Sequence, residues 1–231
     1  MGDRPERQPL SRDAIVDAAI AHVDESGLQA LTMRGLGQRL GVEGMSLYRH
    51  VNGREDLLDA VVERLVRRLH RESRDDLLPA DGWQGYLQWL AHAVRDLAHE
   101  HPHVFPLIAT RHPAAPWIRP PLRSLDVMED FLVALIGRGF SERAAVAAYR
   151  AFSSFLLGHL LLEVTSRGAS TVPVEEVLDE GDAEVPVVDV DLSDYPVTAR
   201  LRPLLSQEHE DDEFELALEN LLHRLEQLVG R

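Results

Sequence analysis

Apolar residues recur every three or four positions along most of the chain, which is the spacing that gives an α-helix one buried face. This pattern predicts long helices over residues 53–70, 83–100, 122–138, 142–165 and 212–229, and shorter ones near 101–111 and 198–205. A first helix fits between Ser11, a good N-terminal cap, and Gly27, a typical C-terminal residue. Because no segment alternates apolar and polar residues convincingly, the sequence predicts an all-α fold.

Two short helices joined by a tight turn are predicted in the stretch LTMRGLGQRLGVEGMSLYRHV, from Leu31 to Val51. Thr32 suits the cap of the first helix, and Gly41 falls where the chain must turn sharply. The apolar residues that close a small three-helix core here are Leu31, Leu36, Leu40, Val42 and Leu47. This is the pattern of a helix-turn-helix, whose second helix enters the major groove of DNA.

The second of these helices is expected over residues 43–50, and its outward residues are candidates for DNA contact. They are Gly44, Met45, Ser46, Tyr48, Arg49 and His50. Arg34, on the first helix, could bind guanine or phosphate, and the hydroxyl groups of Thr32 and Ser46 could bond phosphate or a base edge. Arg54 starts the next helix, where the helix dipole would help it to bind phosphate.

The run from Gly41 to Glu43, followed by Leu47-Tyr48, His50-Val51, Arg54 and Leu57-Leu58-Asp59-Ala60, resembles the signature of the tetracycline-repressor family of bacterial transcription regulators. The resemblance covers roughly the first third of the chain well and the rest more loosely. It implies that Arg34 reads a base and that Tyr48 and His50 bind phosphate. Gly44 and Met45 depart from the family pattern at base-contacting positions, so we expect a different operator, in which Met45 could touch a thymine methyl group.

The helix predicted over residues 142–165 is apolar nearly all round, so it must be buried on more than one face. Small residues, Ala148, Ala151 and Gly158, would let a partner helix approach closely. Together with the apolar stripe over residues 212–229, this helix predicts a four-helix bundle between two subunits. The resemblance implies the same homodimer, bound to a palindromic operator in double-stranded DNA.

The resemblance also implies a small-molecule effector in a pocket of the C-terminal helical domain. Candidate lining residues are His70, Trp89, Phe105, Leu107, Trp117, Met128, Phe131, Phe152, Phe155 and His159. Each fits a plain core position as well, but His70 matches a position that contacts drug in the tetracycline repressors. Leu107 aligns with the histidine that coordinates drug-bound magnesium there, and leucine cannot ligate a metal. The effector therefore stays open, and no cofactor or protein-bound metal is predicted.

The predicted organisation has four parts. A flexible arm over residues 1–9 precedes a helix-turn-helix DNA-binding domain over residues 10–52, and a connecting helix follows over residues 53–70. A C-terminal helical domain for regulation and dimerisation takes up residues 71–231. Within it, residues 175–194 hold nine acidic residues and no basic one, which predicts a flexible acidic loop at about 168–194.

Composition narrows the function classes. The chain has no cysteine, which excludes disulfides and thiolate metal sites. Its polar start, and the lack of an apolar run near the ~20 residues that span a bilayer, predict a cytoplasmic protein without a membrane partner. The net charge is −15, but residues 1–78 hold 12 arginines against 14 acidic residues. That part is therefore nearly neutral, which weakens non-specific DNA binding without forbidding a local basic face.

Two other function classes fit parts of the sequence. A helical-bundle enzyme is disfavoured, because the one Glu-x-x-His pair, Glu100 and His103, has Pro102 inside it and no second pair exists. Nucleophile-elbow, Walker and dinucleotide motifs are also missing, so we predict no catalysis. The near-neutral first domain leaves open a protein-interaction adaptor of the same fold, with weak DNA binding and the acidic loop as its docking element.

Overall fold

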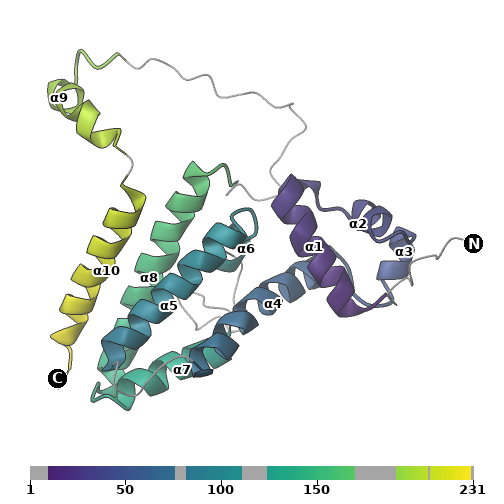
Figure 1. Cartoon of the computed structure of the whole chain (residues 1–231), viewed down its shortest axis with the longest axis horizontal. Coiled ribbons are helices and arrows are strands. Elements are labelled where there is room, and N and C mark those ends of the chain that lie inside the picture. Colours follow the sequence, from purple (N-terminus) through teal and green to yellow (C-terminus); the bar gives the residue numbers. More distant parts are fainter. Residues whose placement is uncertain (1–9, 76–81, 111–123, 170–190, 208, 230–231) are drawn as a thin grey trace, which may run out of the picture.

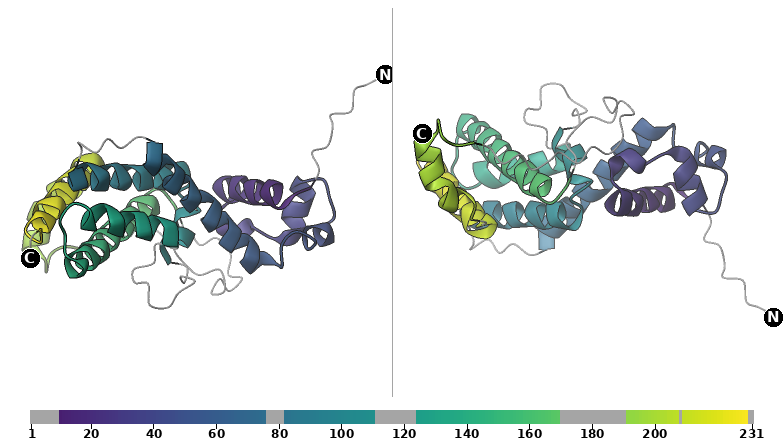
Figure 2. Two further views of the ribbon diagram at one scale, coloured as in Figure 1. Left: turned by 90° about the horizontal axis from the view of Figure 1, so that it is seen from below. Right: turned by 90° about the horizontal axis from the view of Figure 1, so that it is seen from above.

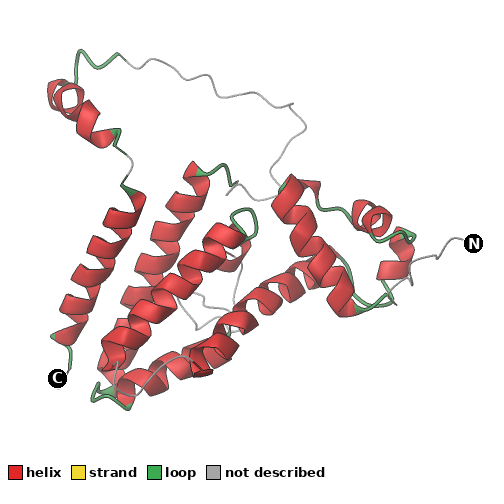
Figure 3. Ribbon diagram, viewed as in Figure 1, coloured by secondary structure: helices red, strands yellow, loops and turns green. Residues whose placement is uncertain are grey.

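The computed structural model describes residues 10–75, 82–110, 124–169, 191–207 and 209–229, with backbone alone over 70–75. Every regular element in these ranges is a helix, which confirms the all-α fold (Figure 3). The helices are α1 (Arg12–Ser26), a 3-10 helix (Leu28–Ala30), α2 (Met33–Arg39), α3 (Gly44–Leu47), α4 (Arg54–Asp75), α5 (Gly82–Glu100), α6 (Phe105–Thr110), α7 (Leu125–Ile136), α8 (Glu142–Ser166), α9 (Pro196–Leu205) and α10 (Glu210–Glu226).

Side-chain caps start the helices where the sequence predicts them. The hydroxyl of Ser11 accepts from the amide of Ala14 at 3.1 Å, and that of Thr32 accepts from the amide of Gly35 at 3.0 Å. Ser141 caps α8 in the same way. Each cap satisfies an amide that the first turn leaves without a helical partner.

The molecule is elongated. Helices α1–α3, here called the head (residues 10–52), form one end, and α10 lies at the other (Figures 1 and 2). Helix α4 leaves the head and packs against α1 as well as α5, α6 and α7. Helices α5–α8 and α10 form the body, whose buried residues are continuous with those of α4. The connecting helix is longer than the predicted 53–70 and ends at Asp75.

Helix α8 lies in the middle of the body, in contact with α5, α6, α7 and α10. Its length and apolar composition would suffice to cross a membrane, which the sequence did not lead us to expect of any segment. The same composition is found in core helices. Eleven of its residues are buried in this single subunit, among them Phe152, Leu156 and Leu160.

Helix α10 differs from its predicted role. Its buried stripe consists of Phe214, Leu218, Leu222 and Leu225, and it packs on α5 and α8 of the same chain. The expectation that this stripe faces a second subunit is therefore wrong for these four residues. Helix α9, by contrast, has no buried residue, and its apolar side chains Val197, Leu201, Leu204 and Leu205 are exposed. It stands apart from the body in Figure 1.

Candidate nucleic-acid interface

The short helix α3 turns one face into the head and the other to solvent. Leu47 is fully buried, whereas Met45 is 74% exposed and Tyr48 is 47% exposed. Arg49 is exposed beside them, and Ser46 and His50 are partly buried. The regular helix ends at Leu47, so residues 48–50 of the predicted helix form a turn. The predicted outward residues, apart from Gly44, thus lie at or next to one solvent-facing tip.

Gly44 serves the packing of the head. A Cβ atom placed on it would lie 3.2 Å from the carbonyl oxygen of Met33 and 3.3 Å from the Cα atom of Arg34. Its missing side chain therefore points at α2 and not at DNA, which corrects the prediction that Gly44 faces outward. Opposite it, a Cβ on Gly37 would lie 2.8 Å from the Gly44 amide nitrogen. Backbone meets backbone at this crossing, so glycine is needed at position 37.

The first helix of the motif has two exposed arginines, and one of them has no acidic partner among the described residues. Arg34 is exposed on α2, one turn from the crossing, and no acidic side chain pairs with it among the described residues. Thr32 is exposed, but its oxygen already accepts the capping bond from Gly35. Its hydroxyl hydrogen remains available to a phosphate or a base acceptor. Arg39, further along α2, is paired with Glu25 of α1.

Arg54 does not have the geometry of a free phosphate ligand. Its Nε donates to the carbonyl oxygen of Leu31 at 3.2 Å, and its Nη2 donates to that of Leu28 at 3.3 Å. The side chain is 28% exposed and its Nη1 lies 3.9 Å from Glu55. The guanidinium therefore fastens the start of α4 to the 3-10 helix, which corrects its predicted role as a phosphate contact.

The carboxylate of Asp56, on α4, binds two parts of the head: α1 and the segment that leads into α4. Arg12 of α1 donates two hydrogen bonds to it, at 3.0 and 2.7 Å, and the amide of Asn52 donates a third at 2.7 Å. Arg12 also donates to the carbonyl oxygen of His50 at 3.1 Å. Hydrogen bonding to Arg12, followed by that to Asn52, lowers the pKa of Asp56 to about 2. Asp56 thereby satisfies the amide of Asn52 directly before α4.

The residues predicted to line an effector pocket fall into separate groups. Phe131 and Phe152 are fully buried in the body, with ring centroids 5.5 Å apart. Phe105 and Leu107 are buried on α6, and Met128 is partly buried on α7. These residues behave as core, and they do not line any of the cavities described here. Trp117 and the side chain of His70 lie outside the described residues.

Trp89 borders a cavity of about 200 Å³ between α4 and α5, together with Leu69 and His92. A larger cavity of about 530 Å³ lies between α4 and the start of α7, next to Val62, Val66 and Leu125. Neither contains a side chain that could ligate a metal together with two others, and no such group of three exists among the described residues.

Phe155 and His159, two further pocket candidates, anchor α10 instead. Their rings lie 6.2 and 5.4 Å from the ring of Phe214, which is fully buried. The guanidinium carbon of Arg95 lies 4.6 Å from the centre of the same ring, a cation–π contact. Phe155 and His159 thus pack between α8 and α10 of the same subunit.

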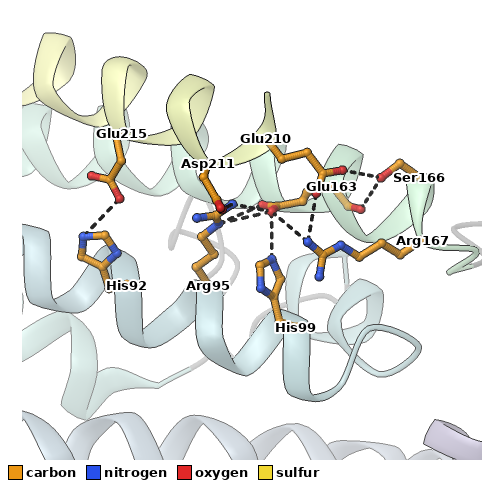
Figure 4. Close-up of polar contacts among 9 residues, drawn as sticks. All are labelled: His92, Arg95, His99, Glu163, Ser166, Arg167, Glu210, Asp211 and Glu215. Carbon is orange, nitrogen blue, oxygen red and sulfur yellow. Dashed lines mark hydrogen bonds and ion pairs between the residues drawn. The ribbon is translucent and has the colours of Figure 1, made fainter. Parts of the chain in front are cut away.

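A buried ion pair joins α5 to α8 beside these rings, and its arginine also reaches an exposed carboxylate of α10 (Figure 4). Arg95 of α5 donates to Glu163 of α8 at 2.7 Å and to Asp211 of α10 at 2.7 Å. His99 lies 2.8 Å from Glu163. Burial raises the pKa of Glu163, but the hydrogen bonds from Arg95 and His99 outweigh it and hold that pKa below its usual value. Sequence reasoning missed this cluster, because its members are far apart in the chain.

Comparison with known proteins gives the same assignment for both parts of the chain. Residues 15–61 match the family described as bacterial regulatory proteins, tetR family, and residues 77–229 match the tetracyclin repressor-like C-terminal domain. The tetracycline repressor protein class D of Escherichia coli is 34% identical over 166 residues, which cover 70% of each chain. The HTH-type transcriptional repressor DrrR1 of Streptomyces coeruleorubidus is 29% identical over all of this chain and 83% of its own.

Solved structures are similar over nearly the whole length. A possible TetR family transcriptional regulator from Streptomyces coelicolor A3(2) superposes with a TM-score of 0.73 at 27% identity, covering 94% of this chain and 99% of that one. The Streptomyces coelicolor TetR family protein ActR, in complex with actinorhodin, gives a TM-score of 0.70 at 25% identity, covering 97% of this chain and all of ActR. The similarity to each of these structures therefore extends over both the head and the body.

Proposed function

Since this chain belongs to the tetracycline-repressor family of bacterial regulatory proteins, we propose that it is a dimeric repressor that a small molecule releases from a palindromic operator. The observation that carries the proposal is the tip of the head, where exposed Met45, Tyr48 and Arg49 surround the buried Leu47. A helix end of this kind fits the major groove. The protein would act in the cytoplasm, where its operator lies.

The side chains at the tip divide between reading bases and binding phosphate. Arg34 is the best candidate for a base contact, since an unpaired guanidinium can bond guanine O6 and N7 together. Arg49, Tyr48 and His50 suit phosphate oxygens. Met45 offers an apolar surface to the methyl group of thymine. Arg54 acts through the position of α4 and not by direct contact.

A genome-wide binding map, followed by footprinting on the sites found, tests this function. We expect a protected palindrome whose half-sites lie one helical turn apart, ~34–36 Å, or a multiple of that distance. Arg34→Ala should relax specificity at one operator position at a cost of about 1–3 kcal/mol. Absence of any protected site across the genome would instead favour the protein-interaction adaptor, which the near-neutral head keeps open.

Exposed apolar residues support a homodimer through α8 and α10. Leu162 of α8 is 77% exposed and Leu216 of α10 is 62% exposed, although both helices pack well on their other faces. Gly158 has no atom within 4 Å of the place of a Cβ, so its side of α8 is open to a partner. Two such helices from each subunit would form a four-helix bundle.

For the effector, we propose a small molecule bound in the body. ActR, which has a similar architecture, has been solved in complex with actinorhodin. The buried Leu107 lacks a metal-binding atom, which speaks against magnesium–tetracycline as the effector of this chain. A library screen for compounds that release the protein from its mapped operator tests the proposal. An operator complex unaffected by every compound would count against ligand control.

A further inference from the structure

A guanidinium group on α1 binds the end of the turn that follows α3. Nη1 of Arg12 donates to the carbonyl oxygen of His50 at 3.1 Å. Nη1 and Nη2 also donate one bond each to the carboxylate of Asp56, at 3.0 and 2.7 Å. An arginine held by both oxygens of a carboxylate has the plane of its guanidinium fixed as well as its position. The donor that reaches His50 is therefore aimed by Asp56, a residue of a different helix.

The turn over residues 48–50 gains from a contact outside itself, because it is not regular helix. Helix α3 ends at Leu47, and the exposed side chains of Tyr48 and Arg49 come after it. The amide of His50 bonds back to the carbonyl oxygen of Leu47 at 2.9 Å. Carbonyl groups at the end of a helical segment lack amide partners, and arginine is one of the side chains that satisfy them. The bond from Arg12 thus fixes the end of the turn whose side chains face DNA.

The same carboxylate holds the chain just after the turn. The amide of Asn52 donates to Oδ2 of Asp56 at 2.7 Å. Val51, which precedes it, is 1% exposed and belongs to the apolar core. Three successive residues, 50–52, are thus held by a carbonyl group, a side chain and an amide respectively. Because the chain passes here from the turn into α4, the position of this segment sets that of the turn.

Arg12 has some features of a phosphate ligand. Its side chain is 45% exposed and stands at the start of α1. Both of its terminal nitrogens are nevertheless engaged, and the carboxylate of Asp56 balances its charge. A DNA phosphate would have to displace these bonds and approach a carboxylate of its own sign. The geometry therefore favours a role inside the head over direct contact.

We propose that Arg12 and Asp56 are positioning residues for operator binding. Together they hold the turn over residues 48–50 in the conformation that presents Tyr48 and Arg49 to DNA, and neither of them contacts DNA. This inference rests on the proposed DNA-binding function. An acidic residue thereby promotes binding to a polyanion, which is opposite to the effect of its charge alone.

The sign of the effect of Asp56→Asn on operator affinity tests the proposal. The substitution removes a negative charge from the protein, which by charge alone should strengthen binding to DNA. If Arg12 bound phosphate, the loss of its carboxylate partner would strengthen binding further. We expect instead an affinity roughly tenfold lower, equivalent to about 1.4 kcal/mol, because the turn loses its fixed orientation. Fluorescence anisotropy of the full-length protein on its mapped operator, at constant salt, measures this.

Two substitutions of Arg12 separate orientation from charge. Arg12→Lys keeps the positive charge but cannot bind both carboxylate oxygens and the carbonyl group from one plane. We expect Arg12→Lys and Arg12→Ala to weaken binding by similar factors, whereas lysine would largely rescue a phosphate ligand. Arg49→Ala should cost less in the Arg12→Ala background than in the original protein, because a turn without its fixed end no longer presents Arg49 well.

Glu25→Gln is the matched control. Glu25 also lies on α1 and binds both terminal nitrogens of an arginine, Arg39 of α2. Its replacement removes the same charge and the same kind of pair, but at the other end of α1. We expect operator affinity to stay unchanged or to rise slightly. Hydrogen exchange of the free protein gives a second measurement: the amides of residues 49–51 should exchange faster in Asp56→Asn than in Glu25→Gln.

Any of three results would overturn the proposal. They are an affinity of folded Asp56→Asn equal to or above that of the original protein, full rescue by Arg12→Lys, and an equal loss of affinity in Glu25→Gln. Circular dichroism identifies the folded variants, and Arg12→Lys takes the place of Asp56→Asn if the latter does not fold. An original protein that binds no operator would refute the proposed function itself, and this appears before any substitution is made. Unchanged exchange in Asp56→Asn and Arg12→Ala would then show that the pair does not hold the turn either.

Discussion

Arginine side chains of the head and α4 divide into two classes with different consequences. Arg34 and Arg49 face solvent beside α3, while Arg12 and Arg54 are held by carbonyl and carboxylate groups of the chain itself. An exposed guanidinium is free to bind phosphate or a base, whereas one held by two carbonyls contributes to folding. The residue type alone does not separate these classes, which is why the sequence assigned Arg54 to DNA.

Replacing Arg54 tests this division. Arg54→Ala should lower the free energy of unfolding by about 1–3 kcal/mol, since two partly buried carbonyl oxygens lose a charged donor. Arg49→Ala is the matched control: it should change stability by less than about 0.5 kcal/mol but reduce the salt dependence of operator binding by about one unit of slope. Urea unfolding and binding at several salt concentrations provide both measurements. The reverse pattern would restore Arg54 as a phosphate contact.

Asp56 makes the stability of the head depend on pH at the acidic end. Its pKa is lowered from 3.8 to about 2 by Arg12 and Asn52, so the unfolded chain binds more protons than the folded one between those values. The stabilisation is complete above pH 3.8 and should be lost as the pH falls through about 2. Asp56→Asn should be less stable than the original protein at neutral pH, and the difference should shrink on acidification. Urea unfolding across this range measures it, and a difference independent of pH would contradict the assignment.

At the scale of elements, local sequence signals predicted where the helices lie. They did not predict which elements each helix packs against. Ser11, Thr32 and Ser141 mark helix starts correctly, because a cap involves residues only three apart. The apolar stripe of α10 was also visible, but a stripe does not say whether it meets its own chain or a second one. The pair of Arg95 and Glu163, 68 positions apart, gave no sequence signal that could have linked α5 to α8.

The crossing of α2 and α3 depends on a glycine that the sequence did not single out. Gly37→Ala should destabilise the head by about 1–3 kcal/mol, because its methyl group would press on the backbone of Gly44, which cannot move aside cheaply. Gly44→Ala should cost less, since its nearest neighbours lie at 3.2 Å and more. Urea unfolding of both variants measures the difference. Equal, small effects would show that the crossing is looser than described here.

At the scale of the whole molecule, exposed and buried apolar residues of α8 and α10 identify different surfaces. Leu162→Asp together with Leu216→Asp should give a folded monomer, since both side chains are largely exposed in the single subunit. Leu225→Asp is the contrasting variant: Leu225 is 2% exposed, so it should unfold the subunit. Sedimentation equilibrium and circular dichroism distinguish these outcomes. A folded double variant that remains dimeric would place the subunit interface elsewhere.

The exposed face of helix α9 affects how long an unassembled subunit survives in the cell. A newly made subunit displays leucine and valine side chains on α9 that are exposed in the part of the chain that the structure describes. Chaperones and proteases bind such segments, so an orphan subunit should be removed faster than an assembled one. The cellular supply of this regulator would then adjust itself: chains made in excess of their partners are cleared, and those that find a mate survive.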